Sequence, residues 1–536
     1  MLKPIQNIKF FFWLTFLSVL AIEARVPLFA PDAYYYFVIS GNIFNKNMLS
    51  FDMETITTGF HPLWLGVLTL LHSVAKTAES LHFLVFLIQA GFVLASVAIL
   101  QRIYIRQSRN DLATVFALTA LITFNLNVFL LGMENTLVFF LLTVFVWLNS
   151  EKIPWKQKIG VSSIILVLAY FARLDTIFLM PIYFGWWLLK SRIFSEKWNF
   201  TFICGTAVAI VILLHFGIML YFFGTIFPTS TLAIKNFLSV QEAKTILERI
   251  VFQEHFLVSW VITLSQVLIP NSIGYHTTLI TIAGLLVWLL PVISAFLAYK
   301  FYKNIAEVVI ILAIFCLVQM AYYAWSSNGW MRAWYYSPWF LVVIPFFTHT
   351  ALYIFKFFQR NIIIVHGFII ILSLSIVTLY GMRTACIGVF KNHECVSIRY
   401  LVDQSSVLQT KFKPDTVLVG FTPDRAVYFG GRSVIHIEGQ VNGYEFVRNY
   451  LPALIPEYLS KISADYFMIS NRYRNPPEMP CKILIASGRD SVAIGELRFG
   501  NSYLVFYDVL IEPKSEKERL NFAKSCLIPD FPLGQS

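Results

Sequence analysis

Long apolar stretches with almost no charged side chains dominate this sequence and restrict what it can fold into. The stretch Asn199–Phe222, for example, contains no Lys, Arg, Asp or Glu, and roughly 20 apolar residues in a helix can cross the hydrocarbon core of a bilayer. Hydrophobic residues make up 57% of the chain and charged residues only 13%, against about 25% charged residues in ordinary globular proteins. A water-soluble fold could not bury so many apolar side chains. The sequence therefore predicts a polytopic α-helical membrane protein.

The lengths of these stretches predict about eleven transmembrane helices. The first begins near Phe10, after Lys3 and Lys9, and we expect it to be retained because no convincing signal-peptide cleavage site follows it. The other helices are expected at Leu81–Leu100, Leu112–Leu131, Asn135–Asn149, Gly160–Phe171, Thr176–Leu189, Asn199–Phe222, Thr277–Tyr299, Ile305–Ala324, Pro338–Phe357 and Asn361–Tyr380.

The distribution of basic residues orients these helices. Lysines and arginines cluster in short loops between the apolar stretches, as in cytoplasmic loops, and this topology explains the net charge of +11 without a nucleic-acid partner. All these loops lie on the cytoplasmic side, together with the N-terminus, only if Pro62–Ala75 does not cross the membrane. We therefore expect Pro62–Ala75 to be an interfacial helix on the outer face. The alternative, an ordinary span, would place Arg102, Arg106 and Arg109 outside.

The chain changes character after about residue 382. Residues 1–382 are predicted to form a transmembrane module. Residues 383–536 carry many more charges and contain strand-like runs at Thr416–Gly420, Ser433–Ile437 and Tyr503–Val509. This region is predicted to be a soluble α+β domain outside the membrane, on the side opposite the cytoplasm.

The cysteines agree with that division. Cys204 and Cys316 lie in apolar stretches, where packed free thiols are expected. An even number of cysteines falls in the predicted outer domain, which would be an oxidising environment. Zinc is not expected there because no CxxC spacing occurs. The disulfide candidates have three possible pairings, of which Cys386–Cys395 with Cys481–Cys526 is the favoured one.

The densest group of polar and aromatic residues follows the first predicted helix. A carboxylate at the membrane surface is partly desolvated, which should make Asp32 a stronger base at neutral pH. Aromatic rings beside it suit a sugar, which offers apolar ring faces and hydroxyls together. A belt of interfacial aromatic residues with one helix-capping Asp explains the same pattern equally well. The candidate substrate-binding residues of this loop are Tyr34, Tyr35, Tyr36, Thr58, His61 and Trp64, with Asp32 as the candidate catalytic base.

Ionisable side chains recur at the predicted outer ends of other helices. A charge costs about 2.5–3.5 kcal/mol at the middle of a bilayer and less near its surface, so one such residue alone would be a side chain reaching toward the headgroups. Together they predict a polar cavity that opens outward, in which a Lys or Arg could bind a phosphate. The candidates are Glu134, Arg173, Asp175, Lys235 and Arg332, with Trp334, Tyr335 and Tyr336 beside them.

Five motifs, in this order, resemble the GT-C superfamily of membrane glycosyltransferases. They are Asp32-Ala-Tyr-Tyr-Tyr, Thr58-Gly-Phe-His-Pro-Leu-Trp, Gly132-Met-Glu-Asn, Ala172-Arg-Leu-Asp and Tyr221-Phe-Phe-Gly-Thr-Ile-Phe-Pro-Thr-Ser-Thr-Leu-Ala-Ile-Lys. Within the superfamily, the chain is most similar to bacterial enzymes of the terminal arabinofuranosyltransferase and mannosyltransferase type. The stretch Gly430-Gly-Arg-Ser-Val-Ile-His-Ile-Glu-Gly-Gln-Val-Asn resembles a recurring part of their periplasmic C-terminal domain. The resemblance covers most of the chain, and the order of the motifs is more specific than any one of them.

The resemblance implies a polyprenyl-phosphate-linked sugar as donor and a cell-envelope glycan or glycolipid as acceptor. It implies catalysis at the outer face of the bacterial cytoplasmic (inner) membrane, with the N-terminus in the cytoplasm, the C-terminal domain in the periplasm and Asp32 as general base. The family often has two adjacent acidic residues in the first outer loop. Here Pro31 occupies the first position, which weakens the case for a divalent metal, and no other cofactor is expected.

These residues predict direct displacement at the anomeric carbon, and hence inversion. Asp32 would remove the acceptor proton while Lys235 and Arg332 stabilise the departing lipid phosphate. Two other functions stay open: a lipid-sugar flippase or transporter, whose charges usually lie near the bilayer midplane, and a non-catalytic, membrane-anchored glycan-binding protein. In the C-terminal domain, a saccharide-binding surface and ordinary solvated strands explain the same residues equally well: Asp424, Arg425, His436 and Glu438.

Overall fold

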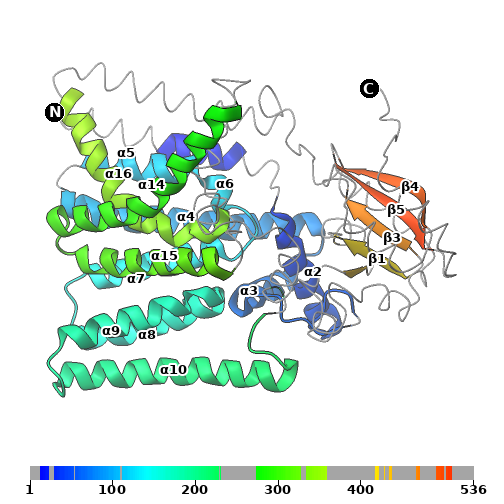
Figure 1. Cartoon of the computed structure of the whole chain (residues 1–536), viewed down its shortest axis with the longest axis horizontal. Coiled ribbons are helices and arrows are strands. Elements are labelled where there is room, and N and C mark those ends of the chain that lie inside the picture. The colour runs from blue at the N-terminus through cyan, green and yellow to red at the C-terminus, as the bar shows by residue number, and fades with distance from the viewer. Residues whose placement is uncertain are drawn as a thin grey trace.

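Among the described residues, those up to Phe358 are mostly helical, and those from Leu418 onward form a small β-sheet (Figure 1). The computed structural model describes residues 13–22, 29–53, 55–108, 111–228, 230, 273–326, 333–358, 417–421, 428, 434–436, 466–470, 491–499 and 502–509. After a short apolar helix, Trp13–Ile22, the helices are α2 (Pro31–Lys46), α3 (Pro62–His72), α4 (Ala78–Ser108), α5 (Asp111–Phe124), α6 (Leu126–Phe129), α7 (Asn135–Ser150), α8 (Trp155–Ala172), η1 (Leu174–Phe178), α9 (Leu179–Lys190), α10 (Glu196–Phe223), α14 (Ile273–Phe301), α15 (Ala306–Ser326), η2 (Ala333–Tyr336) and α16 (Ser337–Phe358).

Four helices among the described residues are long and apolar enough to cross a membrane. They comprise Ala78–Arg106, Glu196–Phe223, Ile282–Phe301 and Ala306–Trp325. All four coincide with spans expected from the sequence. The chain is thus a multi-pass, helical membrane protein. The expected span Asn361–Tyr380 lies outside the described residues, so the total of about eleven stays a prediction.

The segment expected to form the first outer loop contains two helices, α2 and α3. Helix α3 has 11 residues, about half of what a membrane-spanning helix needs, and this agrees with the expectation that Pro62–Ala75 does not cross. Helix α2 begins with Pro31, whose fixed φ suits the first position of a helix, and carries Asp32 in its first turn, where the helix dipole favours negative charge.

The expected span Leu112–Leu131 is not one continuous helix. Helix α5 ends at Phe124, and α6 starts only at Leu126. The side chain of Asn125 donates a hydrogen bond to the carbonyl oxygen of Leu121 at 2.7 Å. It competes there with the backbone for a helical acceptor, which explains the break.

Helix α10 packs against both α8 and α9 along one edge of the bundle (Figure 1). The short pair of spans expected around Arg173 corresponds to α8 and α9, and η1 joins them. The 3-10 turn places Arg173 and Asp175 at the end of this helical pair, next to the first residues of α3. The core of the bundle is built from buried aliphatic and aromatic side chains of nearly every helix.

The sheet contains β1 (Leu418–Phe421), β2 (Ile435–His436), β3 (Tyr466–Ser470), β4 (Ser491–Phe499) and β5 (Ser502–Val509), in the order β2-β1-β3-β5-β4. Strand β1 is parallel to β2 and β3, whereas β5 is antiparallel to β3 and β4. Strands β1, β2 and β5 overlap the three runs expected from the sequence. The domain boundary at residue 382, Asp424, Arg425 and Glu438, and the four cysteines Cys386, Cys395, Cys481 and Cys526 lie outside the described residues.

Candidate functional site

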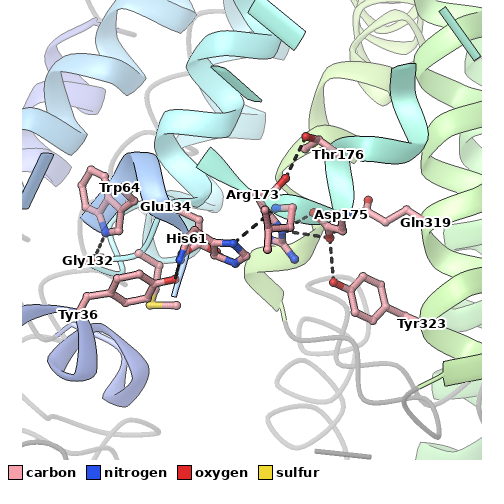
Figure 2. A network of polar contacts seen from close by, with 12 residues as sticks. Tyr36, His61, Trp64, Gly132, Glu134, Arg173, Asp175, Thr176, Gln319 and Tyr323 are labelled. Carbon is pink, nitrogen blue, oxygen red and sulfur yellow. Dashed lines mark hydrogen bonds and ion pairs between the residues drawn. The ribbon is translucent and has the colours of Figure 1, made fainter. Parts of the chain in front are cut away.

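A network of polar side chains lies where the start of α3, the start of α7, the turn between α8 and η1, and the end of α15 meet (Figure 2). We call this network, together with Tyr335 of η2, the polar cluster. Its members come from segments far apart in the sequence: Tyr36, His61, Glu134, Arg173, Asp175, Gln319, Tyr323 and Tyr335.

The turn before α7 can be made only with glycine at its centre. Gly132 has φ of +76°, and a Cβ atom there would lie 2.7 Å from the ring of Phe29 and 2.9 Å from Cβ of Ala33. The backbone N–H of Ala30 donates to the carbonyl of Leu131 at 2.9 Å. The turn therefore packs directly against the start of α2, the helix that carries the candidate base.

Two side chains from other helices fix the same turn. Gln89 of α4 accepts a hydrogen bond from the N–H of Gly132 at 3.0 Å and donates one to the carbonyl of Met133 at 2.7 Å. The indole N–H of Trp64 in α3 donates to the carbonyl of Gly132 at 3.1 Å. Because these backbone groups are held on both sides, the position of Glu134, the next residue, is largely fixed before any ligand binds.

Glu134, which is buried, pairs with the partly exposed His61. Nε2 of His61 lies 3.5 Å from Oε1 of Glu134, whose side chain is 1% exposed against 23% for His61. Nδ1 of His61 accepts a hydrogen bond from the N–H of Leu174 at 3.5 Å, which assigns the ring proton to Nε2, facing the carboxylate. Burial lowers the pKa of His61 below its ordinary value of 6.5, and the charge of Glu134 opposes that shift only in part. His61 is therefore a neutral donor at pH 7.

Arg173 and Asp175 form the most buried ion pair of the cluster. Nε of Arg173, a residue that is 1% exposed, lies 2.9 Å from Oδ1 and 3.1 Å from Oδ2 of Asp175. Oδ2 also accepts hydrogen bonds from Gln319 at 2.8 Å and from the hydroxyl of Tyr323 at 2.9 Å. Burial alone would raise the pKa of Asp175, but Arg173 and these donors lower it below its usual value. Asp175 thus stays ionised and holds the guanidinium in place.

Tyr335 interacts with charged residues from several parts of the polar cluster. The guanidinium carbon of Arg173 lies 3.9 Å from the centre of its ring, which is a close cation–π contact. Burial raises the pKa of the Tyr335 hydroxyl, Arg173 lowers it, and the charges of Asp32, Glu134 and Asp175 raise it further. Tyr335 is therefore within electrostatic range of three carboxylates as well as Arg173, and the partly buried Asp32 is one of these carboxylates.

The structure brings most of the expected site residues into or beside the polar cluster, but not all of them. Tyr36 accepts a hydrogen bond from the N–H of His61 at 3.2 Å. The ring of Tyr35 packs instead on the edge of Phe51, 5.4 Å between centres. The remaining expected residues divide as follows: Thr58 and Tyr336 are buried, Trp334 lies in η2, and Lys235 and Arg332 are outside the described residues.

Tyr34 belongs to a second group of rings, on a different face of α2 from Tyr36. The ring of His82 in α4 lies 5.1 Å from that of Phe29, 5.5 Å from Tyr34 and 5.3 Å from both Phe37 and Tyr428. We call these five residues the His82 cluster. Tyr428, which belongs to the C-terminal part of the chain, connects that part to α2 and α4.

The sequence did not single out Gln89, Gln319 or Tyr323 as site residues. For the two glutamines, the available signal was a lone amide in an otherwise apolar helix, because a buried polar side chain in such a helix needs a partner. Within the part of the chain that the structure describes, no three His, Cys, Asp or Glu side chains are grouped closely enough to hold a metal ion.

Comparison with known proteins identifies the fold. No protein-family model matches the sequence, and no curated protein matches it. Among solved structures, ArnT from Cupriavidus metallidurans bound to undecaprenyl phosphate is similar, with a TM-score of 0.54 and 13% identity over 93% of this chain and 97% of that chain. The archaeal oligosaccharyltransferase AglB from Archaeoglobus fulgidus, in complex with an inhibitory peptide and a dolichol-phosphate, gives a TM-score of 0.48 and 10% identity over 89% of this chain and 70% of that chain. The likeness to ArnT shows that the two chains share a fold.

Proposed function

We propose that this protein is a membrane glycosyltransferase, which moves a sugar from a polyprenyl-phosphate donor to a glycan or lipid acceptor of the cell envelope at the outer face of the membrane. The observation that carries the proposal is the polar cluster, in which a buried guanidinium packs on the ring of Tyr335 and three carboxylates interact with it electrostatically, at the ends of apolar helices. The fold likeness to ArnT, solved with undecaprenyl phosphate bound, supports a lipid-linked donor.

Asp32 is assigned as the general base. It lies in the first turn of α2, partly exposed, and its charge acts on Tyr335. In the proposed reaction, Asp32 takes the proton of an acceptor hydroxyl as that oxygen attacks the anomeric carbon. The bond between this carbon and the phosphate oxygen breaks, and the lipid phosphate leaves with the electron pair. Displacement in one step inverts the anomeric configuration.

Arg173 is assigned to the phosphate. A guanidinium binds phosphate oxygens through paired, charge-assisted hydrogen bonds, and Asp175 holds this one by its Nε side. The same carboxylate balances the buried positive charge when no phosphate is bound. Lys235 and Arg332, assigned to the phosphate from the sequence, stay predictions for the same role.

Asp32→Asn tests the proposal. The variant keeps the shape of the side chain but cannot accept the proton, so sugar transfer from lipid-linked donors should be abolished while membrane insertion and lipid binding persist. Glu79→Gln is the matched control, because Glu79 is also an acidic residue in a first helical turn but is exposed at the start of α4. Transfer should be followed by mass spectrometry of glycolipids from cells with and without the protein. Full transfer by Asp32→Asn would reject Asp32 as the base.

A further inference from the structure

One carboxylate oxygen of the polar cluster has no use in the mechanism above. Oε2 of Glu134 is buried and has no hydrogen-bond partner within the described part of the chain, while Oε1 faces His61. Glu134 precedes α7, yet its side chain makes no hydrogen bond to the N-terminus of that helix. A carboxylate oxygen can only accept hydrogen bonds, and leaving it unpaired in a buried position is unfavourable.

We propose that Oε2 of Glu134 accepts a hydrogen bond from a ring hydroxyl of the transferred sugar, so that Glu134 and His61 form a hydroxyl-recognising subsite beside the reacting carbon. This subsite rests on the proposed function. It adds a specificity-determining residue to it: Glu134 would distinguish sugars that carry the matching hydroxyl from those that lack it.

The geometry of the pair supports an acceptor role for Glu134. Because Leu174 donates to Nδ1 of His61, Nε2 carries the ring proton, and it lies 3.5 Å from Oε1 of Glu134. His61 therefore pairs with one oxygen of the carboxylate, whereas the other has no partner among the described residues. The turn that carries Glu134 is held by Gln89 and Trp64, so the free oxygen stays in place without the ligand. A fixed acceptor of this kind favours the partner that fits it.

The charges around Glu134 favour a hydroxyl over an ammonium group as the partner. The buried guanidinium of Arg173 is close enough to interact electrostatically with both Glu134 and His61. A second cation on the sugar would be repelled by Arg173, whereas a neutral O–H donor is not. Desolvating a hydroxyl also costs much less than desolvating an ammonium ion, which favours the hydroxyl further.

The subsite should be tested with sugars that lack one hydroxyl at a time. The purified full-length protein would be placed in liposomes that contain a panel of undecaprenyl-phosphate-linked pentoses, hexoses and amino sugars, to find the donors that are transferred. The monodeoxy derivatives of those donors would then be compared in the wild type, in Glu134→Gln, and in Glu151→Gln. The last is a control at the opposite end of α7, where Glu151 pairs with Arg106 at the exposed surface.

In the wild type, removing the recognised hydroxyl should lower kcat/KM about tenfold to a hundredfold, as expected for a hydrogen bond to a charged group. Glu134→Gln should lose a similar factor on the parent sugar, and removing the same hydroxyl should then cost little more. Glu151→Gln should behave as the wild type. Since Oε2 accepts no hydrogen bond from the residues that the structure describes, the melting temperature of Glu134→Gln should equal or exceed that of the wild type.

Two results would overturn the subsite. In the first, Glu134→Gln lowers transfer of the parent sugar and of every deoxy sugar by the same factor, which would make Glu134 a structural residue. In the second, an amino sugar depends on Glu134 more strongly than any hydroxyl does. A wild-type protein that transfers none of the lipid-linked sugars would instead reject the proposed function, and the subsite with it.

Discussion

The two histidine-centred regions next to α2 differ in how their polar atoms are satisfied. His82 is completely buried among aromatic rings, and both of its ring nitrogens have partners, with Nδ1 2.8 Å from the carbonyl of Ala78 and Nε2 3.4 Å from the hydroxyl of Tyr34. His61 is partly exposed and lies between a backbone N–H and Glu134, which still has one oxygen without a partner among the described residues.

This difference separates a packing role from a binding role. A cluster whose polar atoms are all satisfied contributes to stability, whereas an unsatisfied buried group at a site lowers stability and is kept for function. Tyr34 and Tyr36, two residues apart on α2, fall on opposite sides of this division. The comparison predicts that substitutions in the His82 cluster reduce stability, and that substitutions around Glu134 reduce activity.

Removing the guanidinium of Arg173 should have the largest effect. Arg173→Ala leaves the carboxylate of Asp175 buried without its cation, so the free energy of unfolding should fall by about 3–5 kcal/mol, and sugar transfer should be lost. Denaturant unfolding in detergent would measure the first effect and a liposome assay the second. The double variant Arg173→Ala/Asp175→Ala should recover part of the stability. No recovery would show that the two residues do not act as a pair.

The matched pair His82→Ala and His61→Ala tests the comparison directly. His82→Ala creates a cavity among packed rings and should lower the free energy of unfolding by about 2–4 kcal/mol, with the activity per folded molecule unchanged. His61→Ala should lower activity strongly and stability little. Thermal melts and initial transfer rates on the same preparations would separate the two effects. Equal losses of stability in both variants would remove the distinction between the clusters.

Gly132→Ala should disturb both the His82 cluster and the polar cluster. The new Cβ would meet Phe29 of the His82 cluster and displace the turn that fixes Glu134. With a positive φ in addition, the expected loss is about 1–3 kcal/mol, accompanied by reduced transfer. Gly66→Ala, where a Cβ would meet nothing within 4 Å, is the control. A Gly132→Ala protein with normal melting and normal transfer would contradict the packing described for this turn.

The smallest expected effect is a pH dependence of stability. Burial lowers the pKa of His61 below 6.5 in the folded protein, so the unfolded chain binds a proton at a pH where the folded protein does not. The contribution of His61 to the free energy of unfolding is therefore fully present above about pH 6.5 and is lost as the pH falls. In melts from pH 8 to pH 5, the difference between wild type and His61→Gln should decline at the acidic end. A constant difference would show that His61 does not titrate as described.

The helices could be predicted from the sequence because membrane-spanning segments are almost uniformly apolar. The same apolar pattern located the break between α8 and α9 at Arg173–Asp175, since charged residues mark the end of an apolar segment. It missed the break at Asn125, because a single amide in an apolar run carries no sign of which carbonyl it will bind. It also could not separate Tyr34 from Tyr36, whose neighbours come from α4 and α3. Gln319 and Tyr323 joined the site only through the folding of α15 against η1.

The contact made by Tyr428 affects how a shortened form of the protein would behave. Its hydroxyl donates to the carbonyl of Ala78 at 3.5 Å, and its ring covers Tyr34, Phe37 and His82. Cutting away the C-terminal region would expose these rings to solvent next to the helix that carries Asp32. If such a truncated protein were inactive, the cause could be damage to α2 just as well as the loss of an acceptor-binding surface.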